Sequence, residues 1–230
     1  HRIGSFNCNS AILHIYYRSA ILVLHLQFVL VSVALGFLIL STALPWLIVN
    51  LFGQRTYSAL DNLTIIITTA SPMSTDALEK SQIDPIISDL NSWIYSNSSF
   101  ALIVGTILYP ISLATMAIAL VLIVLRNKVT SYWTHQTVVA AGILAIVAAA
   151  FWIYSIQSFK IQFSQEAELS GGIIGEEWRG SVERVLDRLI VIGSGPFVVA
   201  AGGIIAIFAF FIERTYIKRE KQNSATQPES

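Results

Sequence analysis

The sequence predicts an all-α integral membrane protein, a bundle of four transmembrane helices with a small extracytoplasmic cap of short β-strands and amphipathic helices. Of its 230 residues, 54% are hydrophobic and 12% are charged, whereas a soluble domain carries about 25% charged residues. Four stretches contain no Asp, Glu, Lys or Arg, namely residues 19–54, 90–125, 129–159 and 189–212. Each exceeds the roughly 20 residues that a helix needs to cross a bilayer. Their apolar runs are continuous rather than alternating, which favours helices over a barrel.

The whole chain, 1–230, is predicted to form a single membrane domain. We expect extracytoplasmic loops at 51–99 and 158–189 and a cytoplasmic tail at 213–230. Pro45 and Trp46 predict a bend near the outer end of the first helix, with the Trp at the membrane interface. The apolar run near the N-terminus is longer than the 7–15 residues of a signal-peptide core, so we expect this helix to be retained. The predicted transmembrane helices lie near 21–50, 100–125, 137–157 and 190–212.

The distribution of basic residues predicts the orientation in the membrane. With both termini on one side, that side holds eight of the 14 Lys and Arg residues and the other side holds six. The connection between the second and third helices is short and purely basic, with Arg126 and Lys128. By the positive-inside rule, both termini are therefore expected in the cytoplasm. The membrane is expected to be the cell membrane, with two sequons facing outward. Asn62 and Asn97 open these Asn-X-Ser/Thr triplets, and both are candidate glycosylation sites in the first outer loop.

The outer loops carry patterns of their own. Residues 63–69 are rich in Ile and Thr, and residues 158–164 alternate between apolar and polar side chains, so each is predicted as a strand. We expect the two strands to pair, because a lone strand would leave its backbone groups unbonded. Asp84 and Pro85 predict the start of a short amphipathic helix. A second one is predicted to lead into the fourth transmembrane helix through the flexible segment 193–196.

The apolar faces of these two amphipathic helices are the predicted interaction surfaces. Each face must rest on another apolar surface, either within the chain or on a partner. The candidate interaction residues are Ile87, Leu90, Trp93 and Ile94 in the first loop and Trp178, Val182 and Val185 in the second.

The order of a long outer loop, a short inner connection and a second outer loop with a predicted strand resembles the claudin type of tetraspan protein. The resemblance concerns topology alone. The claudin family has a Gly-Leu-Trp cluster and a pair of cysteines in its first loop, and this chain has neither there. Its single cysteine, Cys8, lies outside that loop. The resemblance therefore implies no functional residue in this chain.

Reactive side chains are scarce in the predicted transmembrane segments. Proton relays and ion-coupled transporters place ionisable residues in the membrane, but the four charge-free stretches have none. His14 and His25 are too far apart along one helix to share a metal, although His25 and His135 could form a shared site. Cys8 lies between two asparagines, with no base beside it. The sequence thus predicts no catalytic residue, no cofactor and no metal.

Small residues at four-residue spacing predict close helix packing, because they let helix backbones approach in lipid. Together with the absence of reactive groups, they predict a non-catalytic accessory or scaffolding subunit of a larger membrane complex. Its partners would be the lipid bilayer and other membrane protein subunits, and zero net charge argues against nucleic acid. One alternative is a homo-oligomeric channel or facilitator, with Thr106, Ser112 and Thr115 on a polar stripe. Another is a subunit that helps to house a redox or metal centre. The predicted packing residues are Ser32, Gly36, Ala141, Ala145, Ala149, Gly202 and Ala206.

Overall fold

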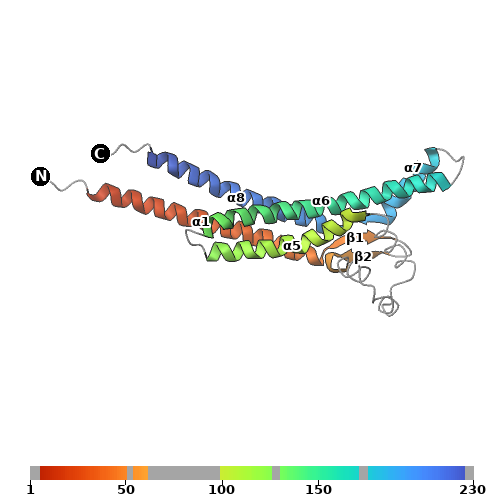
Figure 1. Cartoon of the computed structure of the whole chain (residues 1–230), viewed down its shortest axis with the longest axis horizontal. Coiled ribbons are helices and arrows are strands. Elements are labelled where there is room, and N and C mark those ends of the chain that lie inside the picture. The colour runs from red at the N-terminus through yellow and green to blue at the C-terminus, as the bar shows by residue number, and fades with distance from the viewer. Residues whose placement is uncertain (1–5, 51–53, 62–98, 126–129, 171–175, 226–230) are drawn as a thin grey trace.

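The computed structural model describes residues 6–50, 54–61, 99–125, 130–170 and 176–225, and these are mostly helical. Four long helices dominate the chain (Figure 1), and they are α1 (Phe6–Ala43), α5 (Ser99–Val124), α6 (Thr130–Ser170) and α8 (Gly195–Ala225). The remaining described elements gather at one end of these helices. They are a shorter helix, α7 (Glu176–Leu189), and three strands, β1 (Pro45–Val49), β2 (Arg55–Ser58) and β3 (Ile190–Ile192).

Each long helix contains an apolar span that is long enough to cross a membrane, as the sequence predicted. The shortest span has 18 residues, which at about 1.5 Å per residue approaches the roughly 30 Å of a hydrocarbon core. Both termini lie at the end opposite the sheet, where α1 and α8 reach beyond α5 and α6 (Figure 1). The spans are His25–Ala43, Ala101–Val124, Trp133–Gln165 and Gly195–Ile212.

The four helices pack as neighbours in the order α1, α8, α6 and α5. α6 lies along both α5 and α8, α8 lies along α1, and the contact between α1 and α5 is smaller. Glycines mark the closest approach between α6 and α8, because a Cβ on Gly142 would lie 2.8 Å from the carbonyl oxygen of Gly203. Such close backbone contact favours association in lipid, where the hydrophobic effect does not drive helices together.

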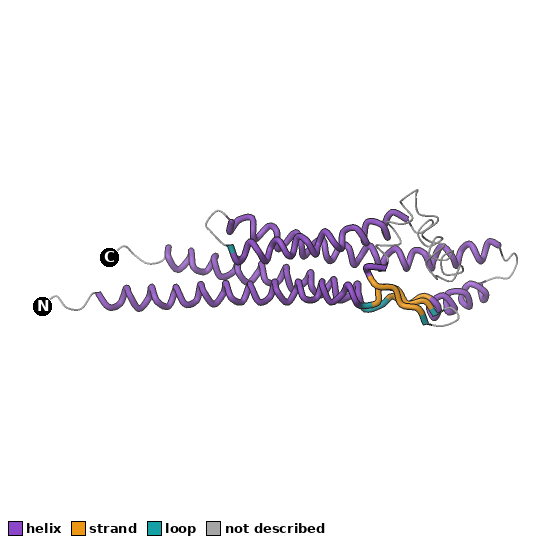
Figure 2. Tube along the Cα trace, turned by 90° about the horizontal axis from the view of Figure 1, so that it is seen from below, coloured by secondary structure: helices purple, strands orange, loops and turns teal. Residues whose placement is uncertain are grey.

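The sheet continues the α1–α8 pair beyond the apolar spans. β1 directly follows α1, β3 directly precedes α8, and the strand order is β2-β1-β3 with antiparallel pairing throughout. Leu47 lies opposite Ile192, and Val49 lies opposite both Ile190 and Arg55. Because α1 and α8 are themselves neighbours, their ends bring β1 and β3 together (Figure 2), although residues 50–189 lie between the two strands in the sequence.

The first and fourth predicted helices were too long at the sheet end. The first was predicted to reach residue 50, but α1 ends at Ala43 and residues 45–49 form β1. Pro45 explains this end, because proline has no N–H to donate and disfavours a helical residue before it. The predicted bend is therefore the end of a helix. The fourth helix was predicted from residue 190, but residues 190–192 form β3 and α8 begins at Gly195.

The predicted strand at 158–164 was wrong, since this segment belongs to α6, which continues to Ser170. Its alternating pattern also places Phe159 and Phe163 four residues apart, on one side of a helix. Their ring centroids lie 6.3 Å apart, and Phe159 is buried in the core. The expected pairing of 63–69 with 158–164 is wrong for the same reason. Residues 63–69 themselves, and the predicted helix that begins at Asp84, lie outside the described residues.

Candidate interaction surface

Trp46 joins the sheet to the helical bundle. Its side chain is 1% exposed, and its ring packs edge-on against Tyr109 of α5 and Trp152 of α6, with centroid distances of 4.9 Å and 5.5 Å. The indole N–H donates a hydrogen bond of 2.9 Å to the carbonyl oxygen of Ser41 in α1. Gly195 lies against the same ring, where a Cβ would collide with it. One side chain of β1 thus contacts four helices, α1, α5, α6 and α8.

A small polar cluster lies directly beneath this junction. The hydroxyl oxygens of Ser41 and Tyr109 are 2.9 Å apart, and each lies 2.7 Å from the carbonyl oxygen of Leu38. All three groups are buried. Buried polar groups cost stability unless they are hydrogen-bonded. Because the groups of this cluster bond to one another, the tyrosine hydroxyl of α5 can contact α1 inside the apolar span without that cost.

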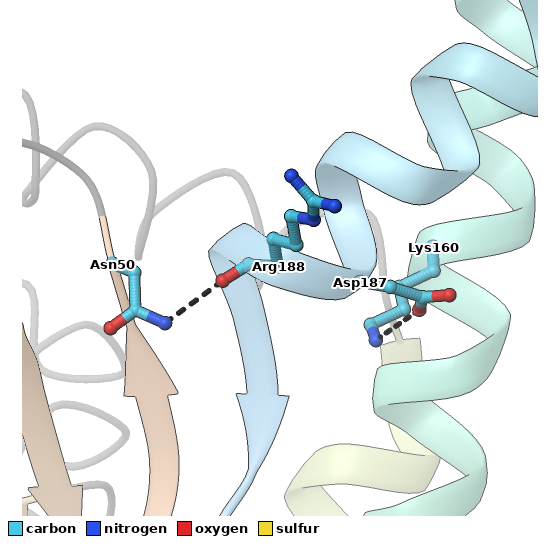
Figure 3. A network of polar contacts seen from close by, with 4 residues as sticks. All are labelled: Asn50, Lys160, Asp187 and Arg188. Carbon is cyan, nitrogen blue, oxygen red and sulfur yellow. Dashed lines mark hydrogen bonds and ion pairs between the residues drawn. The ribbon is translucent and has the colours of Figure 1, made fainter.

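α7 is held between the extension of α6 and the sheet (Figure 3). Lys160 Nζ of α6 lies 2.8 Å from Asp187 Oδ1 of α7, and Asn50 Nδ2 donates a hydrogen bond of 2.8 Å to the carbonyl oxygen of Arg188. Leu186 packs into the core and is 5% exposed, and Val182 is partly buried beside it. The helix therefore has contacts on two sides and keeps a fixed position on the molecule.

Apolar side chains remain exposed at this end of the molecule. Val185 of α7 is 53% exposed, Val191 of β3 is 38% exposed, and Leu60, just after β2, is 59% exposed. None of the three belongs to an apolar span, so lipid around those spans would not cover them. We call Leu60, Val185 and Val191 the sheet-end surface, and it is the candidate interaction surface of the described chain.

Of the predicted interaction residues, Val182 and Val185 lie on α7, as the amphipathic pattern predicted. Val182 points toward the core and Val185 is exposed. Trp178 also lies in α7. The other predicted interaction and glycosylation residues lie outside the described residues, and they are Ile87, Leu90, Trp93, Ile94, Asn62 and Asn97.

The predicted packing residues fall in different environments. Ser32 is partly buried, and a Cβ on Gly36 would meet nothing within 4 Å. Sequence reasoning missed Gly142 and Gly203, which make the closest approach between helices, and also missed the junction at Trp46. The available signal in the sequence was a glycine beside other small residues in each of two predicted helices. The buried members of the predicted set are Ala141, Ala145, Ala149, Gly202 and Ala206.

The polar and histidine candidates for other functions are dispersed. Thr106 and Ser112 are buried, and Thr115 is partly buried. His25 is exposed on α1, and His135 packs its ring against Phe210 of α8. Within the described residues, no group of three or more His, Cys, Asp or Glu side chains could hold a metal ion.

These features define a helical protein whose four long apolar helices suit a lipid bilayer and whose three-stranded sheet lies beyond them. Comparisons of the chain with known protein families, with curated proteins and with solved structures found no match.

Proposed function

We propose that this chain is a non-catalytic accessory or scaffolding subunit of a larger membrane complex, and that a partner subunit docks on the sheet-end surface. The observation that carries the proposal is that α7 has a buried apolar residue on one side and an exposed apolar residue on another. Leu186 is buried in the core, whereas Val185, the preceding residue, stays exposed beyond the apolar spans. An exposed apolar side chain on a fixed helix suits protein contact outside the bilayer.

The position of α7 supports the proposal energetically. Its contacts to α6 and to the residue after β1 hold Val185 in place, so binding need not order the helix. A pre-organised surface loses less conformational entropy on association. Charged Arg184, Asp187 and Arg188 lie close to Val185 in the sequence of α7, which resembles the apolar centre and polar rim of protein interfaces.

The test is purification of the full chain from its native membrane in mild detergent, followed by native mass spectrometry. A partner present in fixed stoichiometry is expected. Val185→Gln is expected to lower partner recovery about tenfold, since covering a valine contributes about 1.5 kcal/mol or more. Val185→Ile is the matched control, because it keeps an apolar side chain at the same position, and recovery should stay unchanged. A monodisperse monomer, or equal recovery with both variants, would refute the proposal.

The proposal includes an orientation, with both termini in the cytoplasm of a cell and the sheet-end surface outside it. Basic residues of the α5–α6 connection and of α8 support this orientation. In the sequence, residues 126–128 contain two basic side chains and no acidic one. The end of α5 and the start of α6, which flank this connection in the sequence, lie toward the same end of the molecule as the start of α1 and the end of α8 (Figure 1).

A further inference from the structure

Aromatic and basic side chains meet between α6 and α8, at the end of the molecule opposite the sheet. The guanidinium carbon of Arg214 lies 6.0 Å from the ring centroid of Phe210. The ring of His135 meets the same phenylalanine edge-on, with centroids 6.0 Å apart. Phe210 therefore contacts the side chain of His135 from α6 and that of Arg214 from α8. We call His135, Phe210 and Arg214 the basic-end cluster.

The basic-end cluster lies at the boundary of the apolar spans. The span of α6 begins at Trp133, and that of α8 ends at Ile212. His135 and Arg214 each lie two residues from those limits, which is less than one helical turn. Trp133 and Arg214 are exposed, and tryptophan is enriched at the level of lipid headgroups. The cluster therefore suits the headgroup layer rather than the hydrocarbon.

The electrostatics of this end favour an anion. Within the described residues, Arg214 makes no ion pair, whereas Lys160 pairs with Asp187 at the other end of the molecule. The sequence around the cluster is basic, since residues 126–128 and 213–225 contain six Lys and Arg against two Glu. A guanidinium group that is free of a carboxylate can donate two parallel hydrogen bonds to a phosphate.

An apolar track leads along α8 to Arg214. Phe208 and Phe211 are both exposed, and the three residues follow each other at three-residue spacing, so they lie along one side of the helix. A phospholipid could place an acyl chain on the two phenylalanines while its phosphate meets Arg214. Inorganic phosphate would use the arginine alone. The track thus favours a lipid as the source of the phosphate.

We propose that the basic-end cluster binds the headgroup phosphate of an anionic glycerophospholipid. Arg214 donates to the phosphate oxygens, and Phe210, which also packs against His135, positions the guanidinium group. The proposal does not depend on the proposed scaffolding function, because it concerns the opposite end of the molecule and a lipid ligand.

The test measures lipid retention by the purified full chain. Native mass spectrometry after exchange into detergent with phosphatidylglycerol or phosphatidylcholine should show one tightly retained phosphatidylglycerol and little phosphatidylcholine. Arg214→Gln should lower retention about tenfold or more, since hydrogen bonds to charged groups contribute about 1.5–3 kcal/mol. Arg214→Lys should have an intermediate effect, because it keeps the charge and loses the bidentate geometry.

Arg188→Gln is the matched control, since it removes an exposed arginine at the opposite end of the molecule, on α7. Equal losses with Arg188→Gln and Arg214→Gln would mean diffuse attraction and would overturn the proposal. Displacement of the lipid by millimolar inorganic phosphate would overturn the assignment to a phospholipid.

Discussion

At the scale of single residues, Trp46 shows how the end of a membrane helix satisfies its backbone. The last four carbonyl groups of a helix have no donor within it, and Ser41 is one of the last four residues of α1. Pro45 cannot supply a backbone N–H. The indole of Trp46 donates to the Ser41 carbonyl instead. A side chain of the sheet therefore caps the helix that precedes it.

Replacing Trp46 by phenylalanine tests this capping bond. Trp46→Phe keeps an aromatic ring but leaves the Ser41 carbonyl without its donor, at a cost of about 1–3 kcal/mol. Trp152→Phe is the control, because Trp152 is equally buried at 1% exposure and its Nε1 has no hydrogen-bond partner among the described residues. Denaturation midpoints in detergent should therefore fall more for Trp46→Phe. Equal shifts would show that the bond contributes nothing.

Two glycines of similar sequence context differ in what surrounds them. A Cβ on Gly203 would lie 2.6 Å from the carbonyl oxygen of Gly142, whereas one on Gly36 would meet nothing within 4 Å. Gly203→Ala should force α6 and α8 apart and destabilise the bundle by about 1–3 kcal/mol. Gly36→Ala should be neutral or slightly stabilising, since alanine favours a helix by up to about 1 kcal/mol. Thermal unfolding of the two variants separates these cases, and a larger loss with Gly36→Ala would contradict the packing described here.

At the scale of elements, α7 is held by packing more than by charge. Asp187 is 70% exposed in its ion pair with Lys160, and exposed pairs contribute about 0–1 kcal/mol. Leu186 is buried, and truncating a buried leucine costs about 2–5 kcal/mol. Hydrogen exchange across α7 should therefore accelerate strongly in Leu186→Ala and little in Asp187→Asn. The reverse order would assign the anchoring of α7 to the ion pair.

The sequence predicts the long helices well, because each depends on a local signal, a long run of apolar residues. It does not reveal β1 and β3, since each is a short apolar segment at the end of such a run, and periodicity cannot separate a short buried strand from a helix. Their pairing joins Leu47 to Ile192, a contact that no local pattern encodes. The strand prediction for 158–164 failed for a related reason, because seven alternating residues also fit a helix that buries Phe159.

The candidate site was predictable to a smaller extent. The amphipathic pattern around Val182 and Val185 predicted the helix α7, since period 3.6 is readable from sequence. It could not predict that Val182 faces the core while Val185 stays exposed, because this depends on where α6 and the sheet hold the helix. The spacing of small residues also predicted both Gly202 and Gly36 as helix-packing positions. A neighbouring helix closely approaches Gly202 but not Gly36.

At the scale of the whole molecule, the zero net charge divides between two ends. With the proposed orientation, the cytoplasmic side has eight basic and three acidic residues, and the outer side has six basic and 11 acidic residues. Basic residues near the ends of short connections oppose translocation across the membrane, whereas acidic residues have little influence. The excess of basic residues beside α5, α6 and α8 therefore argues for a cytoplasmic position of both termini.

Glycosylation mapping in a cell that modifies secreted proteins tests this orientation. Asn62 and Asn97 should both accept glycans, so enzymatic deglycosylation should increase mobility, and Asn62→Gln or Asn97→Gln should each remove one step. Ala225→Thr creates a third triplet at Asn223, near the end of α8. This site should stay unmodified, because the proposed orientation keeps it in the cytoplasm. A glycan at Asn223 together with loss of those at Asn62 and Asn97 would reverse the orientation, and would place the sheet-end surface and its proposed partner on the cytoplasmic side.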